Sequence, residues 1–96
     1  MNYFINHWHD NGQLRLNERN ISVYDVINAI DNGEIIEQYP KDFPFPSCLI
    51  LGISINNTYI HVVVSMNDDK IYLITAYVPS LDIWEKDLKT RKELPK

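Results

Sequence analysis

The sequence predicts an α+β fold, with two N-terminal helices packed on one face of an antiparallel sheet of about four strands. Helical patterns come first along the chain, and strand patterns then follow one another with only turn and loop residues between them. This segregation favours α+β over an alternating α/β arrangement. The 96 residues are 45% hydrophobic, enough for one core and too few for two, so residues 1–96 are expected to form a single domain.

The better marked of the two predicted helices begins at a capping-box pattern. Ser22 is followed three residues later by Asp25, so each side chain can bond the backbone N–H of the other residue. Apolar residues then recur at helical spacing, and the segment ends at an Asn followed by Gly33. The apolar side of this helix is expected to cover the sheet.

An earlier helix is expected over residues 13–19. Arg15 and Arg19 lie four positions apart, which places both guanidinium groups on one side of such a helix. Two guanidinium groups in one row predict a clamp for an anion.

The sheet is predicted from an edge strand, Glu34–Tyr39, and three consecutive antiparallel strands over residues 47–55, 58–66 and 70–78. The three consecutive strands are rich in β-branched, aliphatic and aromatic residues, and clusters of Pro, Asn or Asp separate the four segments. Three prolines hold the loop after the edge strand extended.

The turn between the first two central strands predicts their register. A two-residue Asn-Asn loop pairs Leu51 with Val62 and places Gly52 opposite His61. The face of Leu51 and Val62 is then wholly apolar. The face of His61 is half polar, with open space above Gly52.

The last hairpin leaves two registers open. A three-residue loop keeps Thr75 and Tyr77 on the face of His61, whereas a two-residue loop pairs Met66 with Ile71 and puts His61 and Tyr77 on opposite faces. The three-residue loop is favoured, because it keeps polar side chains out of an aliphatic core. The core-facing residues in that register are Tyr72, Ile74, Ala76 and Val78.

The charge of the chain is divided between an acidic body and a basic C-terminal tail, residues 80–96. The net charge is −4, but residues 86–96 hold five cations and only two carboxylates. Trp84 is expected to anchor the tail on the sheet. The cations of the tail are then expected to reach RNA phosphates or an acidic partner surface. A solvated end is the alternative. The cations assigned to RNA binding are Lys89, Arg91 and Lys92.

The cysteine content and the N-terminus predict a cytoplasmic protein without membrane contact. Cys48 is the only cysteine, which excludes an internal disulfide and fits a reducing compartment. Residues 1–10 lack the basic start and apolar core of a signal peptide, and no apolar run reaches the roughly 20 residues of a membrane span.

No metal or other cofactor is expected. His7, His9 and Asp10 offer ligands that Cys48 or His61 could join, but no repeated Cys or His spacing supports a site. Unpaired histidine motifs of this kind are usually coincidental.

Several motifs, weak alone and specific together, resemble a small bacterial domain of unknown function. They are Arg-Leu-Asn-Glu-Arg-Asn-Ile from position 15, Asp-Val from 25, Gly-Glu-Ile-Ile-Glu-Gln-Tyr-Pro from 33, Pro-Ser-Cys-Leu-Ile-Leu-Gly from 46, His-Val-Val-Val from 61, Ile-Thr-Ala-Tyr-Val-Pro from 74, Trp84, and Lys-Thr-Arg-Lys from 89. The family that this pattern resembles is often found beside a YgiT-type zinc-finger antitoxin. It has been grouped with the barnase, EndoU, colicin and RelE-like (BECR) ribonucleases.

This resemblance implies a metal-independent endoribonuclease that is the toxin of a toxin–antitoxin pair, with RNA as substrate and an antitoxin, of zinc-finger type, as partner. Such cleavage needs a base for the 2′-hydroxyl proton, an acid for the leaving 5′-oxygen, and cations for the charged phosphorane. A histidine, with an ordinary pKa of about 6.5, suits proton transfer near neutrality. The residues assigned to the site are His61, Tyr77, Thr75, Arg15 and Arg19.

One position departs from the family pattern. Relatives usually carry a His four residues before the first Arg, whereas this chain has Asn11, with His7 and His9 nearby. Either the activity is weakened or His9 takes over. The departure and the acidic body favour the alternative function, a non-catalytic protein-binding module whose acidic surface binds a basic partner.

Overall fold

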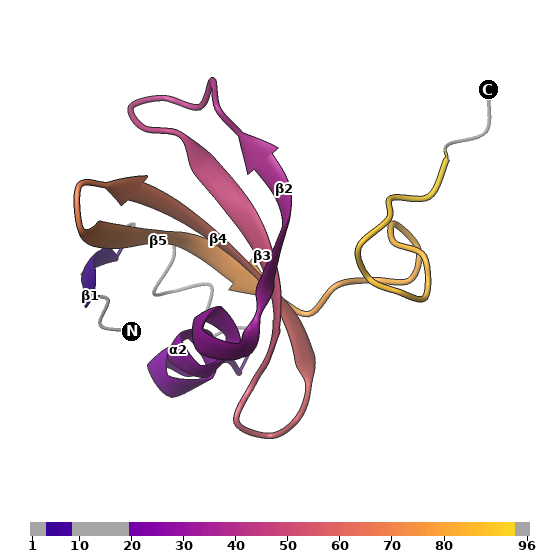
Figure 1. Ribbon diagram of the computed structural model, residues 1–96. Helices are drawn as coiled ribbons and strands as arrows, with labels where there is room; N and C mark the ends of the chain where they lie inside the picture. Colours follow the sequence, from indigo (N-terminus) through magenta and orange to yellow (C-terminus); the bar gives the residue numbers. More distant parts are fainter. Residues whose placement is uncertain (1–3, 9–19, 94–96) are drawn as a thin grey trace.

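The computed structural model describes residues 4–8 and 20–93, which form one helix and a five-stranded sheet. Strands β2 to β5 are antiparallel neighbours in the sheet order β1-β5-β4-β3-β2, and β1 lies parallel to β5 (Figure 1). The predicted α+β class is confirmed. The elements are β1 (Phe4–Trp8), α2 (Val23–Asn32), β2 (Glu34–Tyr39), β3 (Ser47–Ile53), β4 (Tyr59–Asn67) and β5 (Lys70–Tyr77).

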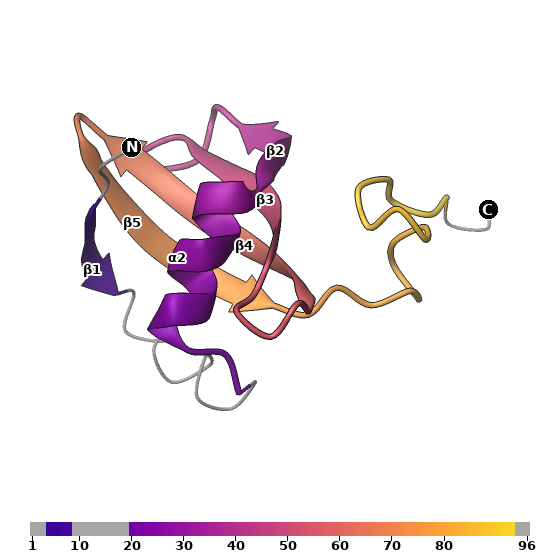
Figure 2. The same cartoon turned by 60° about the horizontal axis from the view of Figure 1, so that its bottom comes forward.

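Helix α2 begins at the predicted capping box and lies across one face of the sheet (Figure 2). The Ser22 hydroxyl accepts a hydrogen bond from the Asp25 N–H at 3.1 Å, and the Asp25 carboxylate accepts one from the Ser22 N–H at 2.8 Å. Val26 and Ala29 are fully buried against the sheet. Gly33 follows the last helical residue, as the sequence predicted.

The N-terminal part differs from the prediction in two ways. The described residues hold one helix rather than two, and the helix expected over residues 13–19 lies outside them. Strand β1 was not expected, because it is short and pairs with the last strand of the chain, a long-range contact that no local pattern reveals. No helix among the described residues is long and apolar enough to cross a membrane.

The face beneath α2, which we call the helix face, forms the apolar core. Its buried side chains come from three central strands and from the inner side of α2. Gly52 lies on this face opposite Ile60, where a Cβ atom would stand 2.1 Å from the Ala29 carbonyl oxygen. The prediction of open space above Gly52 is therefore wrong. The two rows of residues that lie opposite one another across the strands are Ile35, Ile50, Val62 and Ala76, then Gln38, Cys48, Val64 and Leu73.

The hairpin between β3 and β4 closes through three residues rather than the predicted two. The Ser54 N–H donates to the Thr58 carbonyl at 2.8 Å. The register therefore shifts by one residue, and His61 lies opposite Leu51 instead of Gly52. The prediction rested on a two-residue Asn-Asn loop. Because β3 is buried on both faces, its apolar run carries no alternation that could have corrected the register.

The hairpin between β4 and β5 also departs from the favoured register. It closes through two residues, with Met66 opposite Ile71. A β-bulge farther along the pair then changes the phase, and His61 lies directly opposite Tyr77. The predicted shared face of these two side chains is confirmed, although by a different route. Among the four residues predicted for the core in this strand, only Ala76 is fully buried.

The second face of the sheet, which we call the strap face, is covered by residues 80–93. We call this segment the strap, and Figure 1 shows it on the side of β2 and β3 opposite to α2. Trp84 is 2% exposed, so the predicted role of this residue as an anchor is confirmed. The two rows on this face are Glu34, Leu51, His61 and Tyr77, then Glu37, Leu49, Val63 and Thr75.

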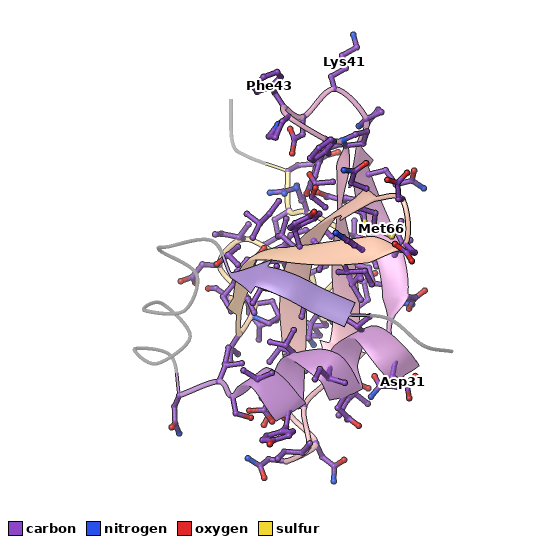
Figure 3. The ribbon with its side chains drawn as sticks, turned by 90° about the vertical axis from the view of Figure 1, so that its left-hand side faces the viewer. Asp31, Lys41, Phe43 and Met66 are labelled. Atoms are coloured by element: carbon purple, nitrogen blue, oxygen red, sulfur yellow. The ribbon has the colours of Figure 1, made fainter. Side chains whose placement is uncertain are left out.

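The loop between β2 and β3 projects from the end of the molecule away from the helix. Figure 3 shows Lys41 and Phe43 at its tip, far from Asp31 on α2. Phe43 is 94% exposed. Phe45 returns to the sheet and stacks on Tyr72, with ring centroids 6.3 Å apart. This contact fixes the loop base beside the strap face.

Candidate functional site

Two β-bulges bring polar side chains together on the strap face. Strict alternation would put residues three apart on opposite faces of a strand. In β2 a register shift between Ile35 and Glu37 places Glu34 and Glu37 on the same face. The bulge in the β4–β5 pair shifts the register so that Tyr77 lies on the same face as His61. Bulges that re-aim side chains are common next to functional sites.

His61 lies at the centre of this face and is completely buried. Its Nε2 is 2.7 Å from the Leu88 carbonyl oxygen and its Nδ1 is 3.3 Å from the Tyr77 hydroxyl. Because a carbonyl can only accept, Nε2 carries the proton and Nδ1 accepts from Tyr77. The ring also meets Trp84 edge to face, with centroids 4.5 Å apart.

Burial lowers the pKa of His61 below its ordinary value. The Leu88 carbonyl and the negative charge of Glu37 oppose this shift, and the positive charge of Arg91 adds to it. The net lowering keeps the imidazole neutral near pH 7. In this neutral form Nδ1, which accepts from the Tyr77 hydroxyl, is the one ring atom with a lone pair that could take up a proton.

Glu37 forms the strongest ion pair described on this face. Arg91 binds it through two nitrogens, Nε at 2.9 Å and Nη2 at 3.0 Å, and the Tyr39 hydroxyl donates to the same carboxylate. The Arg91 bonds chiefly hold the pKa of Glu37 below its ordinary value, and the Tyr39 bond adds to this lowering. Burial, together with the bond to Glu37, raises the pKa of Tyr39 to about 12. The Arg91 guanidinium also lies 4.6 Å from the centre of the Trp84 ring.

The other strap cations are placed differently. Lys89 forms an ion pair with Glu34, in which both side chains are about half exposed. Lys92 is exposed. Its backbone N–H donates to the Ile83 carbonyl at 2.8 Å, a bond within the strap. Two of the three cations assigned to RNA binding therefore bind glutamates of β2.

A cavity of about 390 Å³ lies between the strap and the sheet. It borders Glu34 and Leu51 on the strap face and lies next to Leu88, whose carbonyl binds His61. Its lining includes Asn32, Ile53, Tyr59, Lys86 and Leu88.

The structure brings together part of the predicted site. His61 and Tyr77 are in contact, and Thr75 shares their face one row away. Arg15 and Arg19 lie outside the described residues. Among the residues that are described, no three His, Cys, Asp or Glu side chains are grouped to hold a metal ion. The side chains of His7, His9 and Asp10 lie outside that description.

Sequence reasoning missed Glu37 and Tyr39, and it placed Arg91 in an outlying tail. The available signal was the segment Glu-Ile-Ile-Glu in β2. Two adjacent apolar residues between two acids break the alternation expected of a half-buried strand, which indicates a bulge. The partner of Glu37 comes from 54 residues farther along the chain, so no local pattern could identify it.

A sequence comparison places the chain in a family. Residues 8–78 match the domain of unknown function DUF4258, which covers most of the chain, so the protein belongs to that family. This confirms the resemblance at the level of the family. No curated protein and no solved structure matches the chain significantly. The strap follows the matched region.

Proposed function

We propose that this protein is a metal-independent endoribonuclease that acts in the bacterial cytoplasm as the toxin of a toxin–antitoxin pair. The observation that carries the proposal is the pair of bulges that gathers Glu37, His61 and Tyr77 on one face, with Arg91 against them. The partner is an antitoxin, of zinc-finger type in the families that this chain resembles.

The chemistry assigns a role to each group. His61 offers the lone pair of Nδ1, which accepts from the Tyr77 hydroxyl in this structure and suits a base for the 2′-hydroxyl proton. The Tyr77 hydroxyl gives its proton to the leaving 5′-oxygen and regains one from the His61 imidazolium, which balances the step. Arg91 supplies a planar cation that binds phosphate oxygens as it binds the Glu37 carboxylate. Thr75 positions a phosphate from the neighbouring row. Arg15 and Arg19 remain the further cations of the proposal.

A cleavage assay in the presence of EDTA tests this function. We expect the purified chain to cleave single-stranded RNA, and His61→Gln to reduce the rate by about 100-fold or more, the usual effect of losing a proton-transfer group. Tyr77→Phe should slow cleavage, and Tyr72→Phe on the same face is the matched control. Arg15→Ala and Arg19→Ala should slow cleavage more than they reduce stability. Cleavage by His61→Gln at the rate of the wild type would contradict the proposal.

Complete burial of His61 favours a second candidate, a non-catalytic module that binds a basic partner through its acidic surface. Induced expression with a growth readout separates the two. A toxin should arrest growth, and His61→Ala should relieve the arrest. Equal growth with and without induction of the wild-type chain, together with absence of RNA cleavage, would favour the binding module.

A further inference from the structure

The strap closes the strap face over His61. Trp84 contacts the imidazole edge to face, and the Leu88 carbonyl occupies its outer nitrogen at 2.7 Å. His61 is left with no solvent-accessible surface. No substrate can reach the imidazole while the strap is in this position.

Apart from the buried Trp84 and the bond between His61 and the Leu88 carbonyl, the strap is held to the sheet by ion pairs that are partly exposed. Trp84 is the only buried residue in residues 80–93. The Lys89–Glu34 pair is about half exposed on both sides, and in the Arg91–Glu37 pair the arginine is 54% and the glutamate 23% exposed. Exposed ion pairs contribute little to stability and are screened by salt.

The strap is braced internally, so it can move as a unit. The Glu85 N–H donates to the Thr90 carbonyl at 2.8 Å, and the Asp87 carboxylate accepts from two N–H groups and from the Thr90 hydroxyl. These bonds do not involve the sheet. Leu88, whose carbonyl binds His61, adopts a φ of 61°, a left-handed conformation that is unfavourable for a leucine.

We propose that the strap is a displaceable lid and that a single-stranded RNA opens it by taking Lys89 and Arg91 away from Glu34 and Glu37. A phosphate group offers the guanidinium the same two-oxygen geometry as a carboxylate. A strand that carries many phosphates competes for both cations at once. Opening exposes His61, Glu37 and the cavity beneath the strap. The identity of the polyanion as RNA rests on the proposed function.

Trp84 fluorescence in the full-length chain reports the position of the strap. In a Trp8→Phe background, Trp84 is the only tryptophan. We expect a 2′-O-methyl RNA oligonucleotide, which cannot be cleaved through its 2′-oxygen, to shift the Trp84 emission to longer wavelength and to increase its quenching by acrylamide. Lys89→Gln/Arg91→Gln should show a smaller shift in the same direction without RNA, because the ion pairs are lost while the packing of Trp84 on His61 remains.

Glu34→Gln/Glu37→Gln removes the same ion pairs from the sheet side and should open the strap equally, with an unchanged far-ultraviolet circular dichroism spectrum. Trp84 that stays shielded in both double variants, or in the wild type with RNA at low ionic strength, would overturn the proposal. Opening without cleavage of unmodified RNA would contradict the ribonuclease function but support the lid. Cleavage with Trp84 still shielded would contradict the lid alone.

Discussion

The two faces of the sheet are held in different ways. The helix face is apolar, and α2 approaches it so closely that Gly52 and Gly33 leave no room for a side chain beside Ala29. The strap face has a buried histidine, a tryptophan and two surface ion pairs. One face is closed by close apolar packing alone, whereas the other combines the buried Leu49, Leu51 and Trp84 with polar interactions that water and salt can replace. A site that must open for a substrate belongs on the second kind of surface.

The largest effect should follow from adding one methyl group to the helix face. In Gly52→Ala the new Cβ would stand 2.1 Å from the Ala29 carbonyl oxygen and 2.6 Å from the Ala29 Cα, so α2 must move. We expect a loss of about 3 kcal/mol in the free energy of unfolding, at the upper end of ordinary overpacking. Urea unfolding measures it. Adding Ala29→Gly should not restore stability, because the colliding atoms belong to the backbone. A loss below about 0.5 kcal/mol, the usual size for a surface change, would show that the helix face adapts easily.

Local structure was predictable where neighbouring residues in the chain determine it. The capping box of Ser22 and Asp25, the end of α2 and the edge strand β2 follow from short-range patterns. The register of β3 could not be predicted, because both of its faces are buried and alternation gives no phase.

The candidate site was predictable in part for the same reason. His61 and Tyr77 are polar residues in apolar strands, and this contrast identified them as candidate site residues. Their environment depends on Trp84, Leu88 and Arg91, which fold back from a segment whose cations were expected to face RNA or a partner rather than the sheet. Contacts of this range follow from the whole fold.

Stability on the strap face should depend on pH through His61. Its pKa is lowered in the folded state, so the unfolded chain binds more protons between the folded pKa and about 6.5. The stabilising contribution is therefore complete above about pH 6.5 and is lost as the pH falls toward the folded pKa. Urea unfolding at several pH values between about 7.5 and 5.5 covers this window.

His61→Gln is the control for this pH effect. Its free energy of unfolding should vary less with pH over the same range, and the difference between the two profiles removes the contributions of His7 and His9. The Glu37 carboxylate, whose pKa is lowered, stays ionised throughout and does not contribute. Parallel profiles for the wild type and His61→Gln would show that the folded environment does not favour the neutral imidazole.

The smallest effects should separate the two ion pairs that close the strap. Arg91 binds Glu37 through two nitrogens and lies over Trp84, whereas Lys89 binds Glu34 through one nitrogen between half-exposed side chains. A bidentate pair holds a fixed geometry and is stronger than a single contact. Double-mutant cycles with glutamine at each position should therefore give a coupling energy of about 0.5 to 1 kcal/mol for Glu37–Arg91 and close to zero for Glu34–Lys89. Raising the ionic strength should reduce the larger value, since both charges are in contact with solvent. Equal coupling in the two pairs would mean that the bulge in β2, which turns Glu37 toward the strap, adds nothing to its closure.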